Sequence, residues 1–230
     1  MTTVAQDTKN TNTLAQTFNC TYSGAPTEGN LLIAFLFHDE TSTDIATITS
    51  SGWTRVGTAV GSLSSVSYRI SIWAKYAGAA ESTTVAFDIG EVNRRAHGYA
   101  VEYTGAPLTP IPATDSALVS QGVVDSGATS NQVDDLVNVA AVQFAVAMIG
   151  LNGTSTTTPS WAGGEVTENE DWSNNFRASA IGYIDGPVSD VQPTASWGTS
   201  RASIQAVFVL GAAPDPLVIK ARSSFQVIKS

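Results

Sequence analysis

The chain contains two histidines, His38 and His97, each close to a segment with the pattern of a β-strand. A Ser-His-Asp hydrolase needs a histidine aligned with a nucleophile and an orienting acid, and many such enzymes carry the serine in a G-x-S-x-G turn. The sequence contains no G-x-S-x-G turn. We therefore expect no nucleophilic hydrolysis.

A first acidic cluster follows one of these histidines. His38, Asp39, Glu40 and Asp44 bring several oxygen atoms into one short stretch, as a calcium site would. The stretch lacks the D-x-[DN]-x-[DN]-G order of an EF-hand loop. A solvated loop without metal is therefore the favoured interpretation.

A second acidic cluster, formed by Glu165, Glu168, Glu170 and Asp171, lies beside two tryptophans, Trp161 and Trp172. Paired carboxylates near tryptophan are typical of a glycosidase cleft, and aromatic platforms are also typical of a sugar-binding face. The alternative is that Trp161 anchors a core, as Trp53 would earlier in the chain, and that the acidic residues form a solvated loop. We favour this alternative over catalysis.

A third tryptophan, Trp73, lies in the clear two-residue alternation from Val66 to Tyr76. It shares the nominally polar face with Ser71 and Lys75. It is therefore either covered by a neighbouring loop or exposed as a contact residue, and an exposed tryptophan would mark an interface.

The composition limits the partners of this 230-residue chain. Its formal charge is −9, and no Lys or Arg occurs between Ala96 and Phe176. Phosphate binding needs clustered basic residues, so we expect no nucleic-acid partner. The first residues show neither a basic nor an apolar region of a secretory signal, so we expect assembly in a cytoplasm.

The elements that would position these residues are β-strands. The most apolar run, VNVAAVQFAVAMIGL from Val137 to Leu151, is too short to span a bilayer, which needs about 20 apolar residues, so no membrane contact is expected. Its valines favour a strand buried on both faces, and Leu31–Phe37 is a similar run. Cys20 falls in an alternating stretch and should be a small buried hydrophobe. Together with the many Thr, Ser and Gly residues, these patterns predict an all-β protein that folds as an antiparallel two-sheet sandwich. The polar segment at 113–132 is long enough to contain an edge strand of that sandwich.

The second half of the chain repeats landmarks of the first. Trp161 follows Trp53 by 108 residues and Tyr183 follows Tyr76 by 107 residues. Gly211 follows Gly105 by 106 residues. Similar landmarks in one order favour a duplicated β unit, with approximate halves at 13–106 and 137–212 of a sandwich spanning residues 1–212. Chance similarity between strands of like composition is the alternative.

Residues 213–230 differ from the body because they are basic and begin with two prolines, Pro214 and Pro216. Such an extended C-terminal arm can pair as a strand with a neighbouring subunit, through main-chain hydrogen bonds and opposite charges. A last strand folded back on its own sandwich, or a frayed end, is the alternative. The residues expected to make the assembly contacts are Leu217, Ile219, Lys220, Arg222, Phe225 and Val227.

The stretches GNLLIAFLF, SGWTRVG, SIWAKYAGAAESTTVAF and AHGYAVEYTGA resemble β-sandwich modules of bacteriophage virion proteins and of some bacterial surface proteins. The resemblance covers about Gly29–Ala106 and, more loosely, Val137–Ala212, where Pro159-Ser160-Trp161-Ala162 replaces the GWT triplet. It implies a jelly-roll-like or concanavalin-like fold and a place in an assembled particle. It implies no catalytic residues and no cofactor.

We therefore expect a non-enzymatic virion structural protein, assembled in the host cytoplasm as an oligomer and held in the particle by its termini. It would decorate the capsid exterior and contact other virion proteins, either the major capsid protein or tail components. The alternative is a glycan-binding or tail-fibre module that adsorbs to a host surface through Trp73, Trp161 or Trp172. A glycan-active enzyme is the third possibility.

Overall fold

The computed structural model describes residues 2–13, 15–40, 46–63, 66–92, 94–106, 111–112, 115, 117–135, 137–140, 143–153, 158–162, 166–173 and 177–211. These residues form antiparallel β-strands, and the prediction of an all-β sandwich is confirmed. Within the described ranges, no helix is long and apolar enough to cross a membrane.

Sixteen strands follow one another along the described chain. They are β1 Thr3–Thr13, β2 Thr17–Thr21, β3 Leu31–Glu40, β4 Thr47–Ile48, β5 Thr54–Leu63, β6 Val66–Tyr76, β7 Thr84–Asp88, β8 Arg95–Thr104, β9 Leu118–Gln132, β10 Val137–Val139, β11 Phe144–Leu151, β12 Ser160–Ala162, β13 Thr167–Ser173, β14 Ala178–Asp185, β15 Val188–Val191 and β16 Thr194–Leu210.

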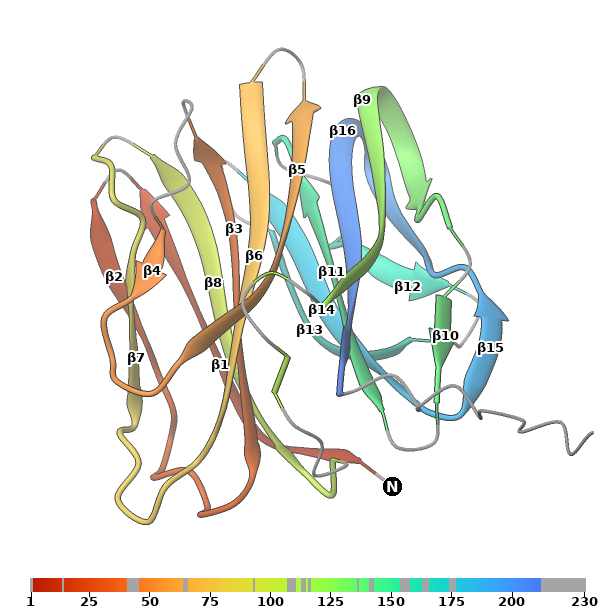
Figure 1. Cartoon of the computed structure of the whole chain (residues 1–230). Helices are drawn as coiled ribbons and strands as arrows, with labels where there is room; N and C mark the ends of the chain where they lie inside the picture. The colour runs from red at the N-terminus through yellow and green to blue at the C-terminus, as the bar shows by residue number, and fades with distance from the viewer. Residues whose placement is uncertain are drawn as a thin grey trace, which may run out of the picture.

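Two large sheets face each other at the centre of the molecule (Figure 1). The first has the order β1-β8-β3-β6-β5, and the second has the order β12-β16-β11-β14-β13 with β9 paired to β16. The main core lies between them and includes Phe35 and Tyr99 from the first sheet and Val146 and Phe208 from the second. The ring of Tyr103 meets that of Phe144 edge-on at a centroid distance of 4.9 Å. Aromatic contacts therefore join the two sheets.

A small sheet covers the outer face of each large one, so the molecule has four layers (Figure 1). The order β2-β7-β4 covers the first large sheet, where Phe87 packs with Leu36. The pair β10-β15 covers the second, where Val139 packs with Val207. The sequence predicted two sheets, and the structure adds these two outer ones.

The four layers explain the continuous apolar runs. On β3, the side chains of Phe35 and Phe37 enter the central core, whereas Ala34 and Leu36 enter the outer one. Every residue of β11 is buried. A strand covered on both faces has no solvent side, so its sequence need not alternate between apolar and polar residues.

Residues 3–104 and 118–210 share one strand order. β1-β8-β3-β6-β5 in the first half corresponds strand for strand to β9-β16-β11-β14-β13 in the second, and β2·β7 corresponds to β10·β15. Gly105 and Gly211 each follow the last strand of their half, with φ of 73° and 108°. β3 and β11, which contain most of the two apolar runs, are each the third strand in this order.

The structure corrects the sequence interpretation of one apolar run. The run from Val137 to Leu151 is not one strand, because β10 belongs to an outer sheet and β11 to a central sheet. The division into halves at 13–106 and 137–212 stays a prediction, and β9 lies between these two ranges. The expectation of an edge strand within 113–132 is confirmed by β9.

Candidate functional site

The two histidines lie in strands of the first large sheet, and His97 contacts a serine. The Nδ1 atom of His97 is 2.7 Å from the Oγ atom of Ser179, and the hydroxyl of Tyr99 is 2.6 Å from the same oxygen. His97 is 1% exposed and Ser179 is fully buried between the two halves. Both side chains are enclosed, and their contact joins β8 to β14.

The first acidic cluster contributes an ion pair to the same interface. The carboxylate of Asp39 accepts a hydrogen bond from the backbone N–H of Arg95 at 2.8 Å and is 3.1 Å from the guanidinium of Arg177. That guanidinium also lies 4.8 Å from the ring centroid of Tyr68. Asp39 is therefore engaged in joining β3 to the start of β14, and the described residues contain no group of three or more potential metal ligands. The side chains of Glu40 and Asp44 lie outside the described part.

A buried carboxylate that the sequence interpretation missed stabilises the first half. Glu102 on β8 accepts hydrogen bonds from Gln6 at 2.6 Å, from the backbone N–H of Thr27 at 2.8 Å and from Asn30 at 2.6 Å. Burial raises the pKa of Glu102, but these hydrogen bonds outweigh it, so the pKa lies below the usual glutamate value. Glu102 is thus an ionised structural group.

The N-terminal strand begins on the second half of the same chain. The backbone N–H and hydroxyl of Thr2 donate to the carboxylate of Asp185 at 2.9 and 2.6 Å, and the hydroxyl of Tyr183 donates to the carbonyl of Thr2 at 3.2 Å. The first described residue is therefore held by its own chain. The expectation that the termini serve as assembly contacts stays a prediction.

The three candidate contact tryptophans occupy different environments. Trp73 is 4% exposed and lies edge-on against Phe87 beneath the small sheet, so the covered alternative is the one observed. Trp161 on β12 is half-buried and packs against two core clusters, as the anchor interpretation expected. Trp172 belongs to β13, but its side chain lies outside the described part, as do those of Glu165, Glu168, Glu170 and Asp171.

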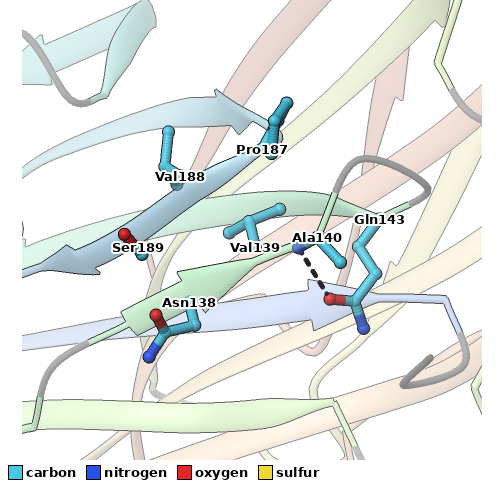
Figure 2. A pocket seen from close by; sticks show the side chains of 7 residues that line it. All are labelled: Asn138, Val139, Ala140, Gln143, Pro187, Val188 and Ser189. Atoms are coloured by element: carbon cyan, nitrogen blue, oxygen red, sulfur yellow. Dashed lines mark hydrogen bonds between the residues drawn. The ribbon is translucent and has the colours of Figure 1, made fainter. Parts of the chain in front are cut away.

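A hollow of about 370 Å³ opens at the outer sheet of the second half. We call it the β10–β15 hollow, and its lining residues are Asn138, Val139, Ala140, Gln143, Pro187, Val188 and Ser189. Its volume falls at the lower end of the range of ligand pockets, about 300–1,000 Å³. Figure 2 shows these side chains on the two strands and the turn that follows β10.

The rim of this hollow is built by short polar contacts. The backbone N–H of Ala140 donates to the side-chain oxygen of Gln143 at 3.0 Å (Figure 2), and the backbone N–H of Gln143 donates to the Ala140 carbonyl at 2.9 Å. The side-chain nitrogen of Gln143 is 3.5 Å from the carbonyl oxygen of Gly211. The hollow therefore lies beside the point where residues 212–230 begin.

A second hollow, of about 310 Å³, lies in the first half between the small sheet and β5–β6. We call it the Trp53 hollow, and it is lined by Ala46, Thr47, Ile48, Trp53, Arg55 and Trp73. The ammonium group of Lys75 lies 5.6 Å from the Trp53 ring centroid. An indole beside a guanidinium can contact a sugar or another flat polar ligand.

The arm residues, Leu217, Ile219, Lys220, Arg222, Phe225 and Val227, lie outside the described part of the chain. No residue lining the β10–β15 hollow was singled out as a site in the sequence. The hollow forms because β10 and β15 come together from about 50 residues apart, and no local pattern encodes that approach.

Comparisons with protein-family models, with curated proteins and with solved structures find no match for this chain. The function must therefore be inferred from the geometry and the sequence.

Proposed function

We propose that this chain is a non-enzymatic structural protein of a virus particle, of the capsid decoration or cement type, that assembles as an oligomer through its C-terminal arm. The observation that carries the proposal is the repeated strand order of its two halves. In the first half the pairs are β1·β8, β2·β7 and β3·β6, with β8 beside β3 and β7 beside β4. A long hairpin of eight strands, rolled up into two sheets, would give these pairs, and such a hairpin is the jelly roll, a fold frequent in viral capsids and lectins. The fourth pair of that hairpin differs here, because β5 pairs with β6.

The second half supports the same interpretation. Its pairs β9·β16, β10·β15 and β11·β14 follow the order of the first, and the two units pack back to back through their large sheets. We attribute this to duplication of one jelly-roll unit. Two such units fused through a buried core give a rigid body with exposed outer sheets.

The reactive side chains also favour a structural role. His97, Ser179, Asp39, Arg177 and Glu102 all make hydrogen bonds or ion pairs inside the fold. Most of these groups are also buried, so the contacts hold a fixed geometry inside the fold. This is the pattern of a scaffold protein.

The charges of body and arm support the mode of assembly. The arm carries Lys220, Arg222 and Lys229 against a single acid, Asp215, whereas the whole chain has a charge of −9. An arm of opposite sign to the body is attracted to the surface of another copy, or to an acidic neighbour in a particle.

Particle association is testable directly. Particles purified on a density gradient from the natural source should contain the chain, and the chain without residues Pro214–Ser230 should be lost from them. If the truncated chain remains in the particle fraction at the full-length level, attachment through the arm is wrong. If the full chain sediments apart from every particle fraction, the virion role is wrong.

A second candidate function, glycan binding for adsorption to a host surface, is favoured by the Trp53 hollow. The hollow has an aromatic wall and a guanidinium, and Trp73 forms part of it although little of that ring is exposed. A glycan array should then show binding that disappears in Trp53→Ala and persists in Trp161→Ala. Absence of any binding by the full chain contradicts this candidate.

A further inference from the structure

Among the described residues, the outer sheet of the second half holds one strand fewer than that of the first half. In the first half β7 pairs with both β2 and β4, whereas in the second half the equivalent β15 pairs with β10 alone among the described strands. β12 is the fourth strand of the second half along the chain, as β4 is of the first half, but β12 pairs with β16 and not with β15. A strand with a free edge presents unpaired N–H and C=O groups that another extended segment can use.

The β10–β15 hollow is lined from both strands of this sheet, by apolar and polar residues, and an acidic residue lies close to it. Val139, Ala140, Pro187 and Val188 supply its apolar lining. The exposed Asp190 follows directly, and its backbone N–H donates to the side-chain oxygen of Asn138 in the lining at 3.0 Å. The site therefore suits an extended segment with alternating apolar residues and basic residues close by.

Residues 217–222 of the arm have this composition. Leu217 and Ile219 alternate with Val218 and Lys220, and Arg222 follows two residues later. In an extended strand, Leu217 and Ile219 would project to one face and could enter the hollow together. The basic side chains would then lie near Asp190.

The position of Gly211, together with the number of residues between it and Leu217, bears on which copy supplies the segment. Gly211 lies at the rim of the hollow, through its contact with Gln143. Pro214 and Pro216 favour an extended exit of ~3.1 Å per residue, which carries Leu217 roughly 19 Å from Gly211. A spacer of this length allows Leu217 to reach a neighbouring copy, whose β10–β15 hollow offers the matching site.

We propose that the β10–β15 hollow receives the arm segment 217–222 of a second copy of this chain, which adds as a strand beside β15. The proposal rests on the proposed function, because it names the partner of the assembly arm. It assigns a receptor surface to residues that the sequence did not single out. Each copy both donates an arm and accepts one.

The test is disulfide trapping between two full-length variants. One carries Ser189→Cys in the hollow and the other carries Ile219→Cys in the arm; the native Cys20 is buried and does not compete. On mixing and mild oxidation, a product that contains one copy of each variant is expected. A matched control pairs Ile219→Cys with Thr17→Cys, an exposed position on the outer sheet of the first half, and should give no product above background.

The alternatives have separate outcomes. A single chain carrying both changes that forms only an internal disulfide places the arm in its own hollow, which overturns the proposal. Equal trapping with the Thr17→Cys control also overturns it. If deleting Pro214–Ser230 abolishes the oligomer whereas Ser189→Trp, which fills the hollow, leaves it intact, this receptor site is wrong and arm-mediated assembly stands. If the deletion leaves the oligomer intact, the proposed function itself fails.

Discussion

Replacing Gly150 with alanine is expected to destabilise the protein, because Gly150 on β11 lies directly against the ring of Phe37 on β3. An added Cβ would be 2.5 Å from two ring carbons of Phe37 and 2.6 Å from a third. Favourable contacts between carbon atoms are at about 3.5–4.0 Å, so the ring would have to move by about 1 Å in a close-packed interior. Overpacking of this kind costs about 1–3 kcal/mol.

Thermal unfolding followed by circular dichroism measures this cost. For a domain of 150–250 residues, each kcal/mol lowers Tm by about 2–4 °C, so Gly150→Ala should lower Tm by about 2–12 °C. Gly24→Ala is the matched control, since a Cβ there meets nothing within 4 Å, and it should change Tm by no more than about 1–2 °C.

A double-mutant cycle makes the test specific for the contact between the two halves. Phe37→Leu shortens the side chain that the alanine would meet, so the combined cost of both changes should be smaller than the sum of the two by at least about 0.5 kcal/mol. If Gly150→Ala is as stable as the control, or if the two costs simply add, the back-to-back packing of the halves is wrong.

Three further predictions follow from the interior. Asp39→Asn should lower the free energy of unfolding, measured with urea, by about 3–5 kcal/mol, because it leaves the guanidinium of Arg177 buried without its carboxylate. Asp115→Asn removes one partner of a half-exposed ion pair and should lower it by less than about 1 kcal/mol. Glu102→Gln should lower the free energy of unfolding by about 1–3 kcal/mol at pH 7, where the carboxylate is ionised. The difference in this free energy from the native chain should shrink as the pH falls below about 4.5, because Glu102 then becomes protonated first in the unfolded chain and then in the folded one. A difference independent of pH would contradict the role assigned to its charge. The Cys20 thiol, whose pKa burial raises to about 12, should not react with a thiol reagent at pH 8 until the protein is unfolded, and rapid labelling of the folded chain would show that β2 is not packed as described.

The sequence predicts the interior of this fold better than its edges. Leu31–Phe37 and the second part of Val137–Leu151 are identifiable because a strand buried on both faces must be apolar throughout. Cys20 is predictable because it belongs to an alternating stretch and is not paired with another cysteine. In these segments burial alone determines the residue types.

The polar strands escape prediction for the opposite reason. β1 reads TVAQDTKNTNT and lies at the edge of its sheet, where solvent tolerates almost any side chain. The break between β10 and β11 is equally difficult to predict from the sequence, because the residues on both sides of it are apolar although they enter different cores. Layer assignment depends on contacts distant in sequence, which a local pattern does not contain.

The candidate site was also only partly predictable from the sequence. The arm is evident from its change of charge and from Pro214 and Pro216, whereas the β10–β15 hollow arises where two short strands meet. Trp73 illustrates the difficulty for aromatic residues, because its alternation places it on an outer face and only the small sheet determines that this face is covered. The proposed binding segment is inferred from the sequence, and the proposed receiving surface is inferred from the fold.

The central claim, assembly through the C-terminal arm, is tested most directly by the mass in solution of the full chain and of the chain without Pro214–Ser230. Sedimentation velocity at physiological ionic strength should give a multiple of the single-chain mass for the full chain and the single-chain mass for the truncated one, with the same far-ultraviolet spectrum for both. Identical association states for the two chains would contradict the account.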